Sequence, residues 1–284
     1  MAWAVLFNTA PAQNFNYAGA IETALSQIPS FPSEDQLGNF TSALATPVLD
    51  TNPVVSAATF LPGIVAGSWV SIFGSNLATA SRAWRSDEFL GDDFSLLPLA
   101  VDSVTVTIDG KPAPVSYVSR TQINMQAPTD TATGPVTVIV THDGQSAAPV
   151  QATLESTAPG FFGYSSGNNL FPAAVHLNGS LVGDPSTIPG AAPAVPGETI
   201  EIFGTGFAPS PSGTENIVVS PLSPAPVVTI GGMQTTVTFA GLSGPGLYQL
   251  SVVVPNLAPR TYAVQVSWDG VTSGSAPQLL IGSN

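Results

Sequence analysis

The chain contains an internal repeat, which constrains its fold more than any other feature of the sequence. Four blocks occur twice in the same order, 130, 122, 127 and 126 residues apart. The paired blocks are residues 67–74 (GSWVSIFG) and 197–204 (GETIEIFG), 104–110 (VTVTIDG) and 226–232 (PVVTIGG), 122–128 (QINMQAP) and 249–255 (QLSVVVP), and 136–144 (VTVIVTHDG) and 262–270 (YAVQVSWDG). A repeat of this kind indicates two copies of one folding unit, and the differences in spacing are expected in loops, which tolerate insertions.

The repeated blocks have the pattern of β-strands. Apolar and polar residues alternate in them with a period of two, which places one set on the buried face of a sheet. Val70 and Ile72 are expected to face the core, and Trp69 is expected to point outward. Three blocks end in an Asp-Gly pair, at residues 109–110, 143–144 and 269–270. Such pairs favour tight hairpin turns, because both residues accept positive φ.

The composition supports an all-β fold. Of 284 residues, 27 are Gly and 27 are Pro, while 44% are hydrophobic and only 8% are charged. The Gly and Pro content argues against helical bundles, and the hydrophobic content excludes a disordered chain. Each copy supplies about seven short strands over roughly 100–125 residues, as in an immunoglobulin-like sandwich. We therefore predict two tandem immunoglobulin-like β-sandwiches, over residues 51–157 and 158–284.

The first 50 residues differ from the rest of the chain. Helical spacing of apolar residues and a capping-box pattern at Ser33 and Gln36 predict one or two short helices within residues 18–50, with the last one ending at Pro47. Residues 1–12 combine an apolar start with a small-x-small pattern, but no basic residue precedes it. Two hypotheses follow for this stretch: the tail of a signal peptide that starts upstream, or an ordinary apolar arm.

The charge balance excludes several partners. Five Lys and Arg residues stand against 18 Asp and Glu residues, for a formal net charge of −13. Nucleic acids are excluded because binding them requires cationic side chains that neutralise phosphates. The sequence has no apolar run of the length that a membrane span needs, so no membrane span is predicted. It has no cysteine either, so disulfides, thiol nucleophiles and thiolate metal sites are excluded.

The search for catalytic motifs gives one weak match. Residues 163–167 (GYSSG) spell G-x-S-x-G, but a nucleophile elbow needs a strand before the serine and a helix after it. A loop pattern follows instead. A hydrolase would need Ser165 or Ser166 near His176, one of two histidines in the chain. We predict no catalytic residue and no cofactor, and that the protein is not an enzyme.

The best candidates for binding are tryptophan and arginine side chains. The stretch Ala78–Ser103 is the longest predicted loop and carries Arg82, Trp84 and Arg85, residue types that are frequent in binding hot spots. The alternative is that Trp84 packs back onto the fold while the arginines pair with nearby acids. Trp69 has two interpretations as well: stacking on a sugar ring, or burial within the chain.

The same loop contains a weak candidate for a calcium site. Asp87, Glu88, Asp92 and Asp93 offer the hard oxygen ligands that Ca²⁺ prefers. Their spacing lacks the D-x-D-x-D-G pattern, and an acidic loop is more often simply solvated. We therefore predict no metal site, and these four residues are only a weak candidate for binding Ca²⁺.

Four stretches carry a family resemblance: residues 62–78, 106–128, 158–162 and 196–209. They are similar to the Solibacter-type C-terminal domain of secreted acidobacterial proteins, itself similar to the IPT/TIG group of immunoglobulin-like folds. The opening Pro, Gly and apolar positions of that group are approximated by Pro62, Gly74 and Leu77. The resemblance covers about residues 53–282. It implies a non-catalytic, secreted or cell-surface bacterial module, and it implies no ligand.

Two functions from different classes are expected. The first is a non-enzymatic extracellular structural or adhesion module, which self-associates by donating the uncharged residues 1–17 as a strand to another copy. The alternative is an accessory module that binds extracellular polysaccharide through Trp69 or Trp84.

Overall fold

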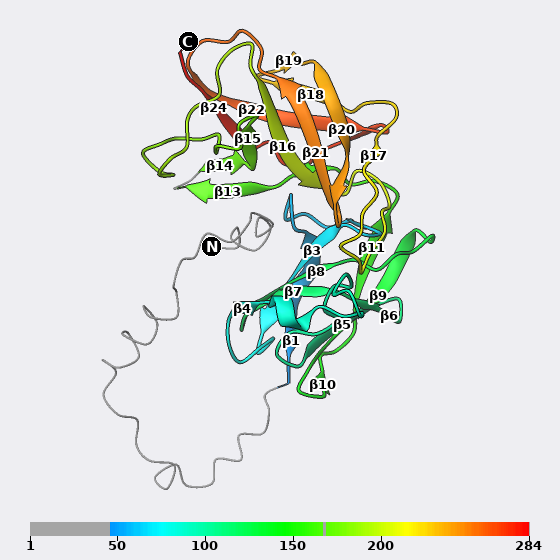
Figure 1. The fold of residues 1–284 in the computed structure, drawn as a ribbon. Helices are drawn as coiled ribbons and strands as arrows, with labels where there is room; N and C mark the ends of the chain where they lie inside the picture. The colour runs from blue at the N-terminus through cyan, green and yellow to red at the C-terminus, as the bar shows by residue number, and fades with distance from the viewer. Residues whose placement is uncertain (1–45, 167–168, 284) are drawn as a thin grey trace, which may run out of the picture. The chain divides into compact units, whose positions relative to one another are not determined.

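The computed structural model describes residues 46–166 and 169–283, and every structural statement below concerns this part of the chain (Figure 1). Residues from Thr46 onward cluster as one compact unit. The predicted helices and the signal-like pattern lie outside the described residues, apart from residues 46–47, which belong to no helix or strand. The first strand begins at Val48, directly after the expected end of the helical stretch at Pro47.

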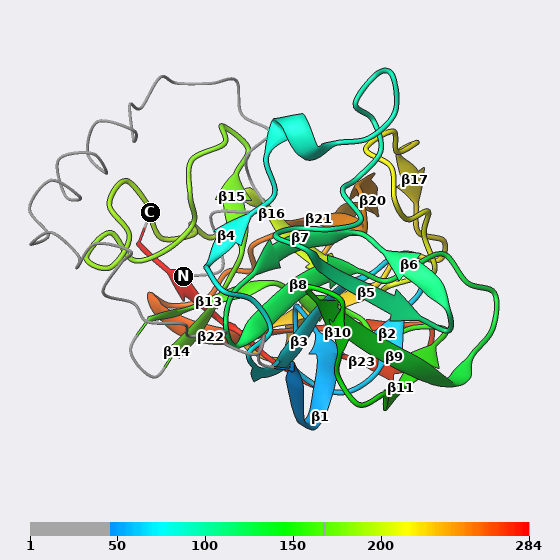
Figure 2. The same cartoon turned by 90° about the horizontal axis from the view of Figure 1, so that it is seen from below.

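The first half of the described chain consists of two sheets (Figures 1 and 2). One sheet has the strand order β1 (Val48–Ser56), β3 (Trp69–Ser75), β8 (Gln122–Gln126), β7 (Val115–Val118) and β4 (Arg82–Ala83). The other has the order β2 (Ile64–Val65), β11 (Val150–Glu155), β9 (Gly134–His142), β5 (Val104–Ile108) and β6 (Lys111–Ala113), with β10 (Gln145–Ser146) beside β9. All pairs are antiparallel except β2 with β11.

The second half repeats this arrangement. Its first sheet has the order β12 (Gly160–Phe161), β16 (Thr199–Thr205), β21 (Leu247–Val253), β20 (Val237–Gly244) and β17 (Ser220–Pro221), with β15 (Ala174–His176) also on β16. The other runs β19 (Met233–Gln234), β18 (Val227–Ile230), β22 (Arg260–Trp268) and β23 (Val271–Thr272), with β24 (Gln278–Ile281) also on β22. A separate hairpin joins β13 (Gly163–Ser166) and β14 (Asn169–Pro172).

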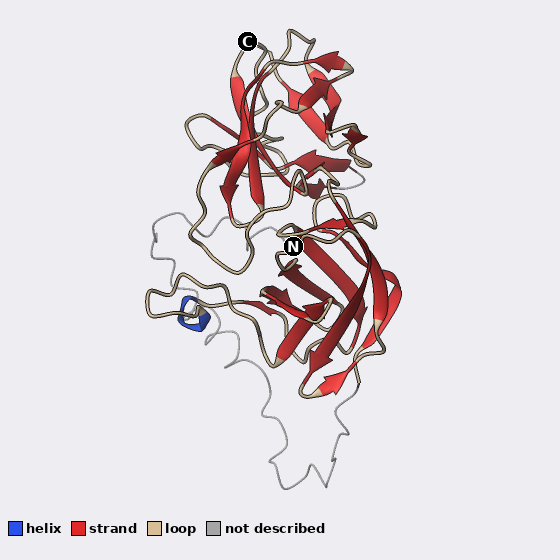
Figure 3. Cartoon of the chain, turned by 90° about the vertical axis from the view of Figure 1, so that its right-hand side faces the viewer, coloured by secondary structure: helices blue, strands red, loops and turns tan. Residues whose placement is uncertain are grey.

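The sequence repeat is therefore a repeat of the sheets. The order β3-β8-β7-β4 has its counterpart in β16-β21-β20-β17, and β9-β5-β6 in β22-β18-β19. Each half has a core of its own, and the two cores share no residue. The 3₁₀-helix η2 (Ser86–Glu88) is the one helix of the described part (Figure 3). The prediction of an all-β fold with tandem immunoglobulin-like sandwiches is confirmed.

Periodicity assigned the core faces correctly. Val70 and Ile72 on β3 are completely buried in the first core, and Ile200 and Ile202 take the same places in the second. The expected hairpin turns are present as well. Asp109, Asp143 and Asp269 each have φ near +50°, and each is followed by a glycine of positive φ. These backbone angles are those that tight hairpins require.

Candidate functional site

A network of hydrogen bonds joins the two halves of the described chain where they meet. The segment between β16 and β17, residues 206–219, runs along the first half and bonds to it through backbone groups. Ser210 N–H donates to the Ala66 carbonyl (3.0 Å), Leu97 N–H to the Gly213 carbonyl (3.0 Å), and Glu215 N–H to the carbonyl of residue 95 (2.8 Å). We call this contact region the seam. It extends the hydrogen bonding of each half into the other.

Gln126, at the end of β8, is the centre of the seam. Its side chain is fully buried, and both ends of its amide are used. Nε2 donates to the carbonyls of Gly67 (3.0 Å) and Pro211 (3.3 Å). Oε1 accepts from Gly213 N–H (3.0 Å) and from Ser212 Oγ–H (3.2 Å). One side chain of the first half therefore binds three consecutive residues of the second.

Trp69, the first residue of β3, is the other main component of the seam. It is 5% exposed and lies outside the first core, so the outward direction predicted from alternation holds, but the second half covers it. Its indole N–H donates to the Pro245 carbonyl (2.7 Å), and its backbone N–H donates to Thr205 Oγ1 (3.1 Å). Thr205 Oγ1–H in turn donates to the Gly246 carbonyl (2.7 Å). Of its two interpretations, burial within the chain is the one that the structure shows.

Two glycines allow the halves to approach so closely. Gly67 has φ +75°, and a Cβ there would overlap the carbonyl of Ser210. Gly246 has φ +61°, and a Cβ there would overlap the carbonyl of Gly67. Both the backbone angle and the lack of space require glycine at these positions.

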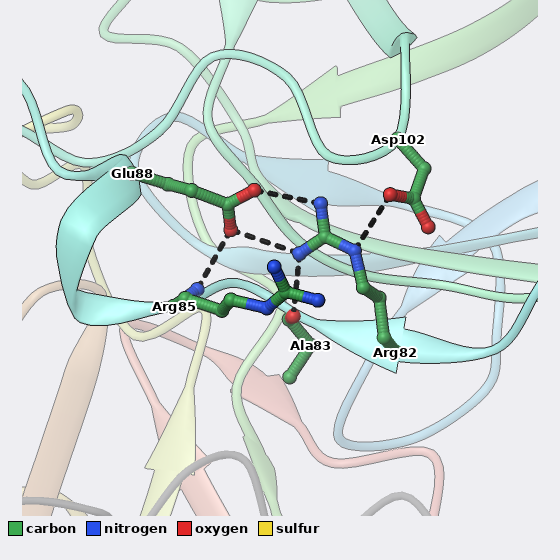
Figure 4. A network of polar contacts seen from close by, with 5 residues as sticks. All are labelled: Arg82, Ala83, Arg85, Glu88 and Asp102. Atoms are coloured by element: carbon green, nitrogen blue, oxygen red, sulfur yellow. Dashed lines mark hydrogen bonds and ion pairs between the residues drawn. The ribbon is translucent and has the colours of Figure 1, made fainter.

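Arg82 organises the long loop of the first half rather than a binding site (Figure 4). Its guanidinium forms a double contact with Glu88, with Nη2 to Oε1 at 2.6 Å and Nη1 to Oε2 at 2.9 Å. Nε donates to Asp102 Oδ1 (2.7 Å), and Nη1 also donates to the Ala83 carbonyl (3.0 Å). The hydrogen bond from Arg82 lowers the pKa of Glu88, and the same bond raises the pKa of Arg82. Arg82 thus forms the pairs with nearby acids that were the alternative to a binding role.

Trp84 and Arg85 differ in how accessible they are. The half-buried Trp84 ring meets Trp69 edge-on (5.9 Å between centroids, 71°) and Phe89 at 5.2 Å. The two tryptophans that were expected as separate candidates therefore form one aromatic cluster. Arg85 uses its backbone N–H to donate to Glu88 Oε2 (2.7 Å), while its side chain is exposed. Its guanidinium forms no ion pair within the described residues.

The acidic residues of this loop do not converge. Glu88 is occupied by Arg82, and Asp93 Oδ1 accepts hydrogen bonds from Ser95 N–H (3.2 Å) and Ser95 Oγ–H (2.6 Å). Asp87 and Asp92 are exposed. In residues 46–166 and 169–283, no three His, Cys, Asp or Glu side chains are placed to hold a metal ion. The calcium hypothesis gains no support from this geometry.

The described part of the G-x-S-x-G stretch, residues 163–166, is the β-strand β13. This strand pairs with β14 in antiparallel orientation, with Ser165 opposite Leu170. His176, at the end of β15, faces two other groups: its Nδ1 lies 3.0 Å from Glu198 Oε2 and its Nε2 lies 3.2 Å from the Ala192 carbonyl oxygen. No helix follows the serine in the described chain, so the framework of a nucleophile elbow is absent there. The one helix of the described residues, η2, is too short to span a membrane.

Sequence reasoning missed the residues that make the seam, above all Gln126. A signal for it was present in the repeat, since the position equivalent to Gln126 in the second copy is Val253. Likewise the position equivalent to Trp69 is Thr199. At these two strand positions, the residue that differs between the copies is the one that contacts the other half.

Comparison with known families finds a similarity in the first half. Residues 53–155 match the model of the IPT/TIG domain. This range runs from within β1 to the last residue of β11, so it contains nearly all of the first pair of sheets. This match supports an immunoglobulin-like fold for the first half. No curated protein matches the chain.

Several solved structures resemble the chain distantly. One is the surface glycan-binding protein SGBP-B of the mixed-linkage glucan utilization locus of Bacteroides ovatus, with 13% identity and a TM-score of 0.30 over 78% of this chain. Others are PbSGBP-B from Prevotella bryantii (11%, 0.26, over 83%) and the Escherichia coli adhesin FdeC (14%, 0.25, over 83%). The chain spans 42% of the length of each glycan-binding protein and 66% of the adhesin. Likeness at this level does not extend to function.

Proposed function

We propose that the protein is a non-catalytic structural or adhesion module that acts outside the cell, in which two immunoglobulin-like sandwiches form one rigid unit. The observation that carries the proposal is the clamp at Gln126, whose four hydrogen bonds tie Gly67 of the first half to residues 211–213 of the second. A rigid pair of sandwiches holds whatever is attached to its ends at a fixed separation, which is what a spacer or adhesin stalk requires.

The connection between the halves supports this rigidity. Ala158 N–H donates to the Gly206 carbonyl (2.8 Å), and a Cβ at Gly206 would overlap the carbonyl of Ala158. The buried Thr157 Oγ1 also approaches the Gly206 carbonyl, at 3.5 Å. The connecting residues are therefore bound to the second half instead of spanning the space between the halves freely. Burying polar groups in this way favours one relative arrangement, because any other leaves them without partners.

Calorimetry tests the rigid unit. The full chain is expected to unfold in one transition whose calorimetric and van't Hoff enthalpies agree, as for a single cooperative unit. Two separate calorimetric transitions would overturn the proposal. A variant that lacks the clamp, Gln126→Ala, is the matched comparison: in it the single transition is expected to broaden or split.

Self-assembly by strand donation is the finer part of the proposal. Strand β1 forms an open edge of its sheet, where a further strand can add through backbone hydrogen bonds. The uncharged residues 1–17 are the proposed donor. Light scattering after size exclusion compares the full chain with a chain that starts at Ala18. Oligomers that disappear on truncation would support donation, and an unchanged number of subunits per particle would refute it.

The polysaccharide alternative stays a prediction and now depends on Trp84. Trp69 is covered by the second half and bonded to Pro245, so it offers no face for stacking. Trp84 is half-buried between Trp69 and Phe89. No other described feature favours a sugar site over a structural module.

A further inference from the structure

A group of exposed apolar side chains lies on the loop that follows η2. Leu90, Phe94 and Leu96 are large apolar side chains that are 45%, 58% and 45% exposed. Single exposed apolar residues are ordinary, whereas several on one short loop mark an interaction surface. We call these three residues the seam patch.

Backbone pairing holds two members of the seam patch on one face. Leu90 N–H donates to the Leu96 carbonyl (2.8 Å), and Leu96 N–H donates back to the Leu90 carbonyl (3.0 Å). Residues paired in this way in an antiparallel bridge point to the same side. The next residue, Leu97, points to the other side and is buried. The outward direction of Leu90 and Leu96 is therefore fixed by the backbone.

The patch is supported by both halves of the molecule. Leu96 also forms an antiparallel bridge with Thr214, which belongs to the segment that crosses from the second half. Figure 2 shows the loop after η2 beside the stretch that leads into β17. Leu90, Leu96 and Thr214 thus lie in three adjacent strand-like segments. A surface built this way is pre-organised, and pre-organisation reduces the entropic cost of binding.

Phe94 is kept outward at a conformational cost. Its φ is +54°, a region that bulky residues rarely adopt. The turn is held by Asp93, whose side chain accepts hydrogen bonds from Ser95, and by Phe94 N–H, which donates to the Gly91 carbonyl (3.1 Å). An aromatic ring displayed on a strained turn indicates a role that a smaller polar residue would not fill.

The charges near the patch indicate what kind of partner fits. Asp87, Asp92 and Glu215 are exposed in the two segments that carry the patch, and Arg85 is the one cation of the loop without an ion pair in the described chain. A second copy of a chain with a net charge of −13 would bring further negative charge. Residues 1–45 contain no Lys or Arg, so they offer no complementary charge either.

We propose that the seam patch docks a segment of another protein that presents apolar side chains flanked by lysine or arginine. The apolar residues of that segment cover Leu90, Phe94 and Leu96, and its cations face Asp87, Asp92 and Glu215. This interaction goes beyond the proposed structural function, since a rigid module without any partner at this surface would still hold its ends apart.

A pair of synthetic peptides tests the proposal on the full chain. One short peptide alternates lysine with leucine and phenylalanine, and the other has glutamate in place of lysine. Fluorescence anisotropy is expected to show binding of the lysine peptide, weakening as salt is raised, and at least about tenfold weaker binding of the glutamate peptide.

Variants separate the patch from general attraction to an acidic protein. The double variant Leu90→Ser/Phe94→Ser keeps every charge and is expected to weaken binding of the lysine peptide by about tenfold or more. The matched control is Leu177→Ser, which removes a 67% exposed leucine in the second half and is expected to leave binding unchanged. Equal affinity of the wild type and the double variant would overturn the proposal. Concentration-dependent self-association that the double variant abolishes would also overturn it, in favour of contact between copies. Calorimetry on the same proteins reports separately on the rigid unit.

Discussion

Replacing Gln126 tests the seam most directly. In Gln126→Ala all four hydrogen bonds are lost, and the carbonyl of Gly67 remains without the amide that satisfies it in the buried seam. A hydrogen bond contributes about 1 kcal/mol net, and a buried group left unpaired costs about 1–3 kcal/mol. Because Pro211 and Ser212 are close enough to the surface to regain water, we expect a loss of about 3 kcal/mol. For a unit of this size that lowers Tm by about 6–12 °C.

The order of three variants makes this prediction specific. Gln126→Glu is expected to destabilise more than Gln126→Ala, because a carboxylate oxygen would replace the amide donor that faces the carbonyls of Gly67 and Pro211. Gln151→Ala is the control, since it removes an exposed hydrogen bond to Thr137 (3.0 Å) and should cost at most about 0.5 kcal/mol. Urea denaturation followed by circular dichroism gives all three values. If Gln126→Ala costs no more than Gln151→Ala, the seam does not hold the halves together.

Three further variants probe other contacts. Trp69→Phe keeps an aromatic ring but loses the hydrogen bond to the Pro245 carbonyl. Urea denaturation should show that the free energy of unfolding is lower by about 1–2 kcal/mol. An unchanged denaturation midpoint would contradict the hydrogen bond between Trp69 and Pro245. Glu88→Gln weakens the contact with Arg82. Because the hydrogen bond from Arg82 lowers the pKa of Glu88 in the folded state, the wild type should lose stability relative to the variant as the pH falls below about 4.5. Parallel profiles of stability against pH for the two proteins would refute this. Burial raises the pKa of Tyr248 to about 12, so the stability of the wild type should fall as the pH rises from 10 to 12. Thermal melts should show a smaller decrease of Tm over this pH range in Tyr248→Phe. Identical decreases in the two proteins would count against the burial of Tyr248.

The strands of the fold could be predicted from the sequence because their information is local. Alternation in residues 67–74 and 197–204 places Val70 and Ile72, and their counterparts, in the two cores, and the Asp-Gly pairs place the turns. The blocks occur twice in the same order, so the sheets do as well. Each of these inferences uses a pattern that can be seen directly in the sequence: the alternation of apolar residues, an Asp-Gly pair, or a repeated block.

The seam could not be predicted in the same way, because it joins residues far apart in the chain. Gln126 reads as an ordinary polar residue at the end of a strand, and nothing near it in the sequence shows that residues 211–213 reach it. Trp69 illustrates the same limit: alternation gives its direction, but what covers it is 136 to 176 residues away. The residue type of Arg82 does not separate a binding site from an internal ion pair, because a guanidinium suits both, and in the structure Arg82 pairs with Glu88 and Asp102.

The two sides of the seam are synthesised at different times. The last strand of the first sandwich ends at Glu155, and Pro211 follows it 56 residues later, which corresponds to about 3–11 s of translation at about 5–20 residues per second. During that interval the first sandwich has been synthesised, while the indole of Trp69 and the amide of Gln126 await their partners. On neighbouring ribosomes of one messenger RNA, a nascent first half therefore displays the surface that another chain's second half is shaped to cover. Exchange of halves between molecules is thus the characteristic misassembly to expect of this chain, and a slower supply of residues 206–219 would promote it.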